Sequence, residues 1–433
     1  MLNNVGNRRS FLATSAIAGG AMLAGTAELG QTAHVAGSEV LKVGLIGCGP
    51  RGTGAAVNAL NADPQAKLTA MADLFMENIR FSRENIRKLK GVQTAVDDDH
   101  CFTGFSGYQG VLQSDVDVVI LALPPFFHPK YLQAAVDVGK HVFCEKTHAV
   151  DPPGVRAVLA AGEEAREKNL CVVSGLAWRY HAGVRETMNR VLDGAIGEIN
   201  AIEATCNTGS LRCRARQSGW SEMEYQLRDW FNFTWLTCDL PGLNSVHDLD
   251  KAAWAMGDQP PLKCWGTGGR QVRVGPRFGD VWDHHATVFE YEGGTKLFAF
   301  CRQQDGCKTD ISDRFYGTKG RCDLLRCRID GEIPWRYEGP DCNRFDAEHA
   351  ALFAAIRDGR AINNSLYMAR SSMLAIMATW ASYTGQEITW ERAMKSERLA
   401  GPTTEISFET EPPTKPDARG EYPIPITGLT RFI

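Results

Sequence analysis

The sequence predicts an α/β protein: an N-terminal doubly wound parallel sheet, then a C-terminal α+β domain with a large, mainly antiparallel open sheet. From residue 41 to about 178, short continuous apolar runs alternate with helical patterns, as in strands covered by helices on both faces. Beyond residue 194, apolar and polar residues alternate between glycine turns, as in antiparallel strands with one covered face. The chain of 433 residues exceeds one ordinary core, so two domains are expected.

A glycine-rich loop follows the first predicted strand. Gly47 would make a tight turn, Gly49 would let the backbone approach a pyrophosphate, and Gly52 would let the next helix pack against the strand. That helix would direct its N–H groups and positive dipole end toward the phosphates. A second apolar run ends at Asp73, where a carboxylate is needed for a ribose hydroxyl. The pattern predicts a Rossmann domain whose dinucleotide contacts include Gly47, Gly49, Pro50, Arg51, Gly52 and Asp73.

Asp73 favours NAD over NADP because a carboxylate accepts from free ribose hydroxyls and repels a 2′-phosphate. Arg51, in the loop, could offset part of that repulsion. NADP therefore stays open as the second choice.

Paired arginines, Arg8 and Arg9, precede an apolar run of small residues from Ala13 to Ala27. This is typical of a twin-arginine export signal, and the run is too weakly apolar to span a bilayer. We assign residues 1–37 to this signal and expect a periplasmic protein with no membrane span in its mature form. Because this route carries folded proteins to a compartment without a nicotinamide pool, we expect the cofactor to be held tightly.

Composition is ordinary, with 44% hydrophobic and 23% charged residues and a formal charge of −4. The chain carries no excess of positive charge that would attract a nucleic acid, so a nucleic-acid partner is not expected. The 13 cysteines show no zinc-like spacing, and we expect most to be reduced and buried. One or two disulfides in the C-terminal half remain open.

The sequence resembles the glucose–fructose oxidoreductase, inositol dehydrogenase and rhizopine-catabolism family (Gfo/Idh/MocA). The resemblance covers nearly all of the chain after residue 40 and depends on the order and spacing of its motifs. These are Gly47-Cys48-Gly49-Pro50-Arg51-Gly52, Ala122 to Pro129, Gly139 to Lys146, Gly175 to His181, Trp235 to Asp239, Val246 to Asp250, Glu348 to Ile356 and Thr384 to Trp390.

The resemblance implies a Rossmann domain over residues 38–195 and a substrate and oligomerisation domain over 196–400, whose open sheet often packs against a partner subunit. A homo-oligomer is therefore expected. The segment from Arg212 to Trp235 reads as a long, irregular substrate loop, and residues 401–433 read as an extended surface tail.

Oxidising a sugar alcohol needs one group to take the hydroxyl proton and another to polarise the oxygen. The resemblance assigns these roles to Lys146 and His247, with Asp239 orienting either group or binding hydroxyls. Two departures bear on this. Leu243 stands where many members carry a carboxylate four residues before the histidine, and Thr147 stands where the family has proline.

Other candidates follow strand ends. Pro124, His128, Glu145 and Lys146 are expected at the cofactor, and Trp178, Arg179 and Tyr180 at the substrate. His284 and His285 are neighbours on a predicted strand, so they point to opposite faces and no metal site is predicted.

The leading functional hypothesis is an oxidoreductase acting on a sugar, sugar derivative or cyclitol with bound NAD(H). The second is a glycoside hydrolase or lyase that oxidises a ring hydroxyl transiently, eliminates the glycosidic bond and returns the hydride. The third is a sugar-binding protein that has kept the fold without catalysis.

Overall fold

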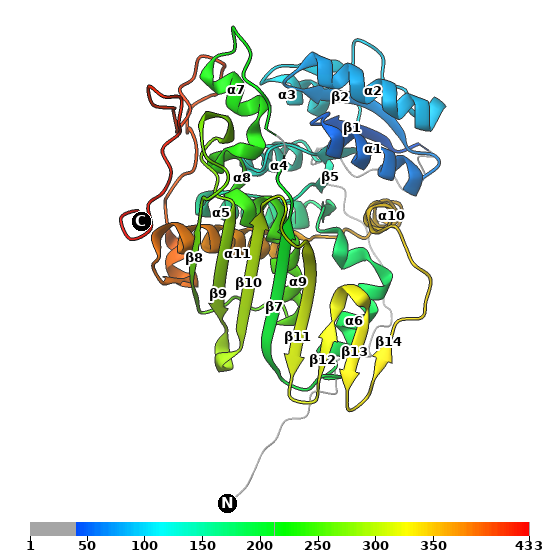
Figure 1. Cartoon of the computed structure of the whole chain (residues 1–433). Coiled ribbons are helices and arrows are strands. Elements are labelled where there is room, and N and C mark those ends of the chain that lie inside the picture. Colours follow the sequence, from blue (N-terminus) through cyan, green and yellow to red (C-terminus); the bar gives the residue numbers. More distant parts are fainter. Residues whose placement is uncertain (1–39, 212, 433) are drawn as a thin grey trace, which may run out of the picture. The chain divides into compact units, whose positions relative to one another are not determined.

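The computed structural model describes residues 40–211 and 213–432. The predicted signal, residues 1–37, lies outside the described residues, so export stays a prediction. The described chain forms two sheets, one in each half of the sequence (Figure 1). The fold class expected from the sequence is confirmed.

The first sheet has six strands in the order β3-β2-β1-β4-β5-β6, and every neighbouring pair is parallel. Its central strands are buried runs such as Val-Val-Ile-Leu in β4, because helices cover both faces. The strands are β1 (Lys42–Ile46), β2 (Lys67–Asp73), β3 (Cys101–Thr103), β4 (Val118–Leu121), β5 (His141–Cys144) and β6 (Val172–Ser174).

Alternate residues of these strands enter two separate hydrophobic clusters. In β4, Val118 and Ile120 pack with α1 and α2, whereas Val119 and Leu121 pack with α3, α4 and α5. The sheet is therefore doubly wound, and ligands are expected beyond the carboxyl ends of its strands. The helices are α1 (Pro50–Ala62), α2 (Met76–Lys90), α3 (Gly107–Gln113), α4 (His128–Asp137) and α5 (Pro152–Glu167).

The second sheet has nine strands in the order β14-β13-β12-β11-β7-β10-β9-β8-β15. It is mixed, because β10 pairs with β7 in parallel while the other pairs are antiparallel. Hairpins alone therefore do not account for it. The strands are β7 (Ile199–Thr208), β8 (Lys263–Gly269), β9 (His284–Glu290), β10 (Lys296–Gln303), β11 (Asp310–Gly317), β12 (Gly320–Asp323), β13 (Arg328–Gly331), β14 (Trp335–Arg336) and β15 (Ile388–Thr389).

Helix α11 (Ser365–Thr384) joins the two halves of the molecule. It is apolar or small on nearly all sides and almost entirely buried, as expected for a helix enclosed by protein. It contacts α5 of the first domain, and α9 (Val246–Ala255) and β8 of the second. The remaining helices are α6 (Ala182–Leu192), α7 (Glu222–Arg228), α8 (Thr234–Thr237), α10 (Arg344–Arg357) and α12 (Trp390–Lys395).

The segment expected to be irregular from Arg212 to Trp235 contains α7 and the start of α8, so that expectation is wrong in part. Ser221 caps α7 by accepting from the Glu224 amide, and acidic residues occupy its first turn. The tail from residue 401 has no helix or strand among the described residues.

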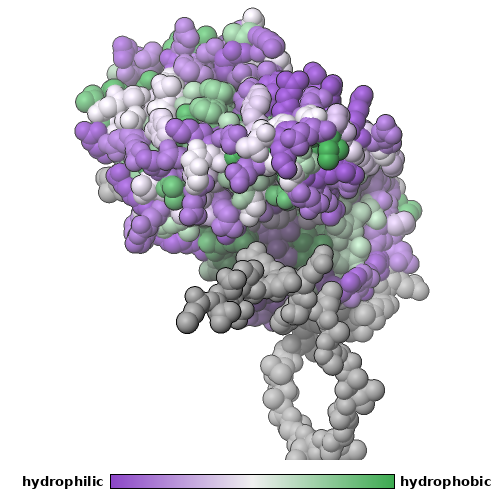
Figure 2. Space-filling view, turned by 90° about the horizontal axis from the view of Figure 1, so that it is seen from below, coloured by the Kyte–Doolittle hydropathy of each residue, from purple (hydrophilic) through white to green (hydrophobic). Residues whose placement is uncertain are grey.

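All thirteen cysteines lie in the described part of the chain and are free thiols, eight of them buried. No helix within residues 40–211 and 213–432 is long and apolar enough to cross a membrane. Hydrophilic residues predominate on the face shown in Figure 2, with hydrophobic ones scattered among them.

Candidate active site

A cleft of about 750 Å³ opens where β1, β2 and β4 end. Its walls come from the glycine loop, the residues after β2 and β4, and a segment of the second domain. The lining includes Gly47, Gly49, Pro50, Arg51, Gly52, Asp73, Phe75, Asn78, Phe105, Tyr108, Pro124, Phe127, Leu211, Arg214, Leu227, Arg228, Asp229, Trp230 and Phe231.

Each of the three loop glycines meets a different steric demand. Gly47 has a φ of +98°, and a Cβ there would lie 2.2 Å from the Ala122 carbonyl oxygen. A Cβ on Gly52 would lie 1.8 Å from the Gly47 carbonyl oxygen, so the helix could not approach the loop. A Cβ on Gly49 would meet nothing within 4 Å, so this glycine leaves open space at the N-terminus of α1. This is the geometry that a bound phosphate requires.

Asp73 anchors the loop to the end of β2. Its Oδ2 accepts from the Cys48 amide at 2.7 Å, and its Oδ1 accepts from the Phe75 amide and Asn78 Nδ2, both at 2.9 Å. Burial raises the pKa of its carboxyl, and these donors oppose that rise. The carboxylate retains acceptor capacity toward the cleft because each oxygen can accept more than one hydrogen bond.

Arg51 connects the glycine loop to two buried carboxyl groups. Its Nε lies 2.8 Å from Glu145 Oε1, and its guanidinium lies 4.8 Å from the centre of the Phe345 ring on α10. Glu348, one turn further along α10, is fully buried, and neither of its carboxyl oxygens has a hydrogen-bond partner among the described residues. Burial and the nearby Glu145 raise the pKa of Glu348 well above its usual value.

Lys146 follows β5 and reaches into the second domain. Its Nζ donates to the Leu243 carbonyl oxygen at 2.5 Å, and the neighbouring Thr147 hydroxyl donates to the Gly242 carbonyl oxygen. The Lys146–Thr147 peptide is cis. Burial lowers the pKa of Lys146, while Glu145 opposes this.

His247 lies in the first turn of α9, and its buried Nδ1 has no hydrogen-bond partner among the described residues. Burial lowers its pKa well below the usual value, and the positive charges of Lys146, Lys251 and Arg344 lower it further. The charge of Lys146 therefore acts on His247, and the lowered pKa favours the neutral imidazole. A neutral imidazole near a lysine of lowered pKa can share with it the acceptance and donation of a proton.

Asp239 belongs to a buried network in the second domain. Its Oδ2 accepts from the Trp282 amide at 2.9 Å and from the Tyr383 hydroxyl, and lies 3.3 Å from His285 Nε2. Its Oδ1 accepts from the Leu240 amide at 2.6 Å. Despite burial, the neighbouring His285 and these donors lower its pKa. The structure gives it four protein partners, and its catalytic role stays a prediction.

The three predicted substrate residues lie between the domains. Arg179 forms short ion pairs with Asp250 and Asp258, at 2.8 and 2.5 Å, and Tyr180 donates to Asn364 Oδ1 at 2.9 Å. The half-buried Trp178 lies under cations, with Arg344 at 4.1 Å and Lys251 at 5.1 Å from its ring. Their roles toward a substrate stay predictions.

His128 is fully buried and does not line the cleft. Its Nδ1 donates to the Thr147 carbonyl at 2.6 Å, and its Nε2 accepts from the Leu123 amide at 3.3 Å. Burial lowers its pKa to about 4. In this position it fixes the chain on both sides of the strand ends. Pro124 lines the cleft directly.

The two adjacent histidines lie on opposite faces of β9, as expected. His284 pairs with Asp283 at 2.7 Å and is partly exposed, whereas His285 is buried near Asp239. Among the residues that the structure describes, no group of three His, Cys, Asp or Glu side chains could hold a metal ion.

The sequence did not assign any cofactor contact to the second domain, yet Leu211, Arg214 and residues 227–231 line the cleft. The tryptophans and arginines of this segment were the available signal. They were interpreted as a substrate loop because sequence gives no measure of which cleft a loop covers.

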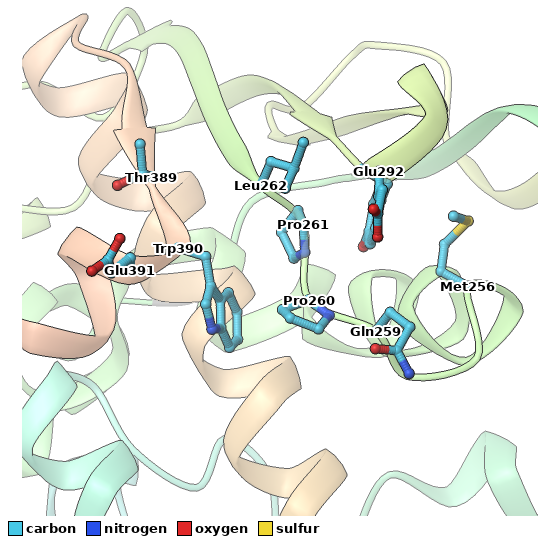
Figure 3. A pocket seen from close by; sticks show the side chains of 10 residues that line it. Met256, Gln259, Pro260, Pro261, Leu262, Glu292, Thr389, Trp390 and Glu391 are labelled. Atoms are coloured by element: carbon cyan, nitrogen blue, oxygen red, sulfur yellow. The ribbon is translucent and has the colours of Figure 1, made fainter.

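A further pocket of about 570 Å³ lies on the second domain (Figure 3). It forms where the end of α9, the turn after β9 and the start of α12 meet, and Trp390 points toward Pro260. None of the predicted site residues lines it. Its side chains are Met256, Gln259, Pro260, Pro261, Leu262, Tyr291, Glu292, Thr389, Trp390 and Glu391.

The fold and the cleft define a dinucleotide-binding protein with a second sheet domain. Residues 41–175 match the model of the GFO_IDH_MocA family, described as an oxidoreductase family with an NAD-binding Rossmann fold. This match agrees, over the first domain, with the resemblance seen in the sequence.

Characterised relatives are similar over part of the chain. A dTDP-3,4-didehydro-2,6-dideoxy-alpha-D-glucose 3-reductase from Actinomadura kijaniata is 28% identical over 39% of this chain and 46% of its own. An inositol 2-dehydrogenase from Klebsiella pneumoniae is 28% identical over 50% and 55%. A 2,7-anhydro-N-acetylneuraminate hydratase from Escherichia coli is 26% identical over 41% and 44%. The chain spans about half the length of these relatives.

Solved structures extend the likeness of fold to both domains. An aldose-aldose oxidoreductase from Caulobacter crescentus, solved with glycerol, superposes with a TM-score of 0.64 at 19% identity, over 81% of this chain and 99% of that one. A levoglucosan dehydrogenase, solved with NADH and levoglucosan, superposes with a TM-score of 0.63 at 16% identity, over 81% and 99%.

Proposed function

We propose that this protein is a nicotinamide-dependent oxidoreductase acting on a hydroxyl group of a sugar, sugar derivative or cyclitol. One observation carries the proposal: Lys146, whose pKa burial lowers, follows β5 and lies near enough to His247 on α9 to lower the pKa of that histidine, in the same fold as a glycine-loop cleft shaped for a dinucleotide. The family match and the relatives that act on sugars or inositol support this choice of substrate class.

The residues present fit a dinucleotide. Gly49 leaves open space at the N-terminus of α1, where phosphates are favoured, and Asp73 stands at the end of β2, where a ribose is expected. When bound, the nicotinamide would accept a hydride from the carbon that bears the hydroxyl.

Lys146 would take the hydroxyl proton, because burial lowers its pKa and makes the neutral amine accessible. The Leu243 carbonyl orients its Nζ. His247, which is neutral because burial and the charges of Lys146, Lys251 and Arg344 lower its pKa, would donate a hydrogen bond to the reacting oxygen and stabilise the negative charge that develops there.

We propose NAD as the preferred cofactor. Asp73 carries the negative charge that disfavours a 2′-phosphate, and Arg51, the cation of the glycine loop, is paired with Glu145. The proposal also includes export by the twin-arginine route and a cofactor that stays bound between turnovers. Comparing the affinities for NAD and NADP by calorimetry tests the cofactor choice.

The second candidate is a hydrolase, lyase or hydratase that works through a transient keto sugar. A relative named as a 2,7-anhydro-N-acetylneuraminate hydratase supports it, and so does export, since this reaction needs no external electron acceptor. Lys146 or His247 would then remove the proton next to the transient carbonyl.

A single experiment separates the two candidates. The purified protein, loaded with NAD, is offered aldoses, inositols and aryl glycosides without an added acceptor. An oxidoreductase gives one equivalent of reduced cofactor and stops. A glycoside-cleaving enzyme releases phenol over many turnovers and incorporates solvent deuterium beside the oxidised carbon. Absence of both reactions across the panel, with NAD bound, would favour a sugar-binding protein without catalysis.

A further inference from the structure

The cofactor cleft is covered by residues 213–231, a segment that belongs to the second domain and is called the roof below. Arg214, Asp229, Trp230 and Phe231 of the roof line the cleft together with Asp73. Because Asp73 marks the ribose of the adenosine half in this fold, the roof covers that half.

Arg228 is the main link from the roof to the Rossmann domain. Its guanidinium lies 3.6 Å from the centre of the Phe75 ring, and its Nη1 donates to Glu77 Oε1 at 2.6 Å. Its Nε donates to Glu224 Oε1 at 2.8 Å within the roof. The side chain is 13% exposed, so these charge-assisted bonds and the stacking are screened only partly by water.

The tail, residues 401–432, holds the roof from outside. Its Phe408 packs edge-on against Phe105 at 5.1 Å and stacks with Phe75 at 6.1 Å between ring centres. Its Tyr422 donates to Glu222 Oε1 at 2.5 Å, and Gln226 Nε2 donates to the Thr414 carbonyl oxygen at 2.8 Å. Figure 1 shows the tail running beside α7. The tail therefore contacts both sides of the cleft.

We propose that the roof and the tail form a clasp that retains the adenosine half of the dinucleotide. The inference rests on the proposed function for the identity of the ligand and adds the element responsible for retention. For the dinucleotide to leave, the roof must separate from the Rossmann domain. That separation breaks the Arg228–Glu77 ion pair and the contact of Arg228 with the Phe75 ring, while the Phe408–Phe75 contact holds the tail on the Rossmann domain.

The clasp is separate from the candidate catalytic pair, because neither Lys146 nor His247 lines this cleft. Loosening it is thus expected to change cofactor release without changing the chemistry at the lysine. The test uses Glu77→Gln and Phe408→Ala, singly and combined, in the full-length protein. Glu77 is 61% exposed, and Phe408 lies in a segment without helix or strand, so both variants should fold. Glu163→Gln is the matched control, because it breaks an exposed ion pair with Arg166 on α5.

The measured quantity is the rate at which bound NAD leaves the protein after mixing with excess labelled NAD. The double variant should release NAD about tenfold faster or more, as expected when each lost contact changes the dissociation rate rather than the association rate. Amide hydrogen exchange in the roof should rise in parallel, while the control matches the wild type.

Equal release rates in the wild type and the three clasp variants would overturn the clasp even if NAD binds tightly. A wild type that binds no NAD at all would instead count against the proposed function. If wild-type NAD exchanges quickly yet the double variant releases it faster still, the clasp stands and only tight retention fails.

Discussion

Replacing Lys146 with alanine should lower turnover by about 10²- to 10⁴-fold, the usual contribution of a positioned acid–base group. This corresponds to an increase in the activation barrier of about 2.7 to 5.4 kcal/mol. The structure makes the loss specific to chemistry, because Lys146 does not line the cofactor cleft and its Nζ donates to the Leu243 carbonyl oxygen. NAD affinity should therefore stay within about twofold of the wild type, well under the 1.4 kcal/mol that a tenfold change represents.

The pH dependence supplies a second readout. In the folded protein burial lowers the pKa of Lys146 from 10.5, so a larger fraction of the side chain is a neutral amine at any pH below 10.5. The rate should rise with pH through the lowered pKa, with its inflection below 10.5. Because the unfolded chain binds this proton more tightly, stability should also rise with pH in the same window, and the alanine variant should lose that dependence.

The assay follows reduced nicotinamide by absorbance in a single turnover with the best substrate of the sugar and cyclitol panel. Lys146→Arg is the matched control: it keeps the positive charge but cannot give up its proton at accessible pH. Both variants should be impaired. Full activity in Lys146→Ala, or recovery in Lys146→Arg, would refute a proton-accepting lysine.

Three further outcomes are expected. Gly49→Val should fold normally but bind NAD at least about tenfold more weakly, because the new side chain projects into open space at the phosphate site. Gly47→Ala should instead lower the melting temperature by several degrees, since its Cβ would meet a carbonyl oxygen and its φ is positive. Burial lowers the pKa of His128 to about 4 from 6.5, so its contribution to the free energy of unfolding is complete above pH 6.5 and is lost as the pH falls toward 4. In His128→Gln, the loss of stability over that pH range, measured by urea unfolding, should therefore be smaller by up to about 3 kcal/mol. Analytical sedimentation should show an oligomer of this chain. Ile311→Lys, at a half-exposed apolar position on β11, should shift the distribution toward the monomer. An unchanged distribution would place the interface elsewhere.

The parallel sheet was predictable because its signal is local. Continuous apolar runs such as β4 and the glycine loop after β1 each carry their meaning within a few residues. The pairing of β10 with β7 was not predictable in the same way. The alternation of each strand fixes which residues face the core, but it does not name the neighbouring strand or its direction.

The site shows the same division. Asp73 could be located by its spacing from the glycine loop, since both lie in one β-α-β unit. Arg228 could not, because it reaches Glu77 across 151 residues of sequence. A loop rich in arginine and tryptophan indicates binding, but only the folded chain shows that it covers the dinucleotide cleft.

Leu243 shows how a residue can matter through its backbone. By the resemblance described above, it stands where many members of the family carry a carboxylate. In the structure its carbonyl oxygen accepts from Lys146 at 2.5 Å. This acceptor is a backbone group that any residue at position 243 would supply, and a neutral carbonyl orients Nζ with a smaller effect on its charge than a carboxylate would have. The same burial that lowers the pKa of Lys146 then acts with less opposition, and Glu145 is left as the main group that raises it. A lysine held in this way can act as a base at a lower pH than one held by a carboxylate.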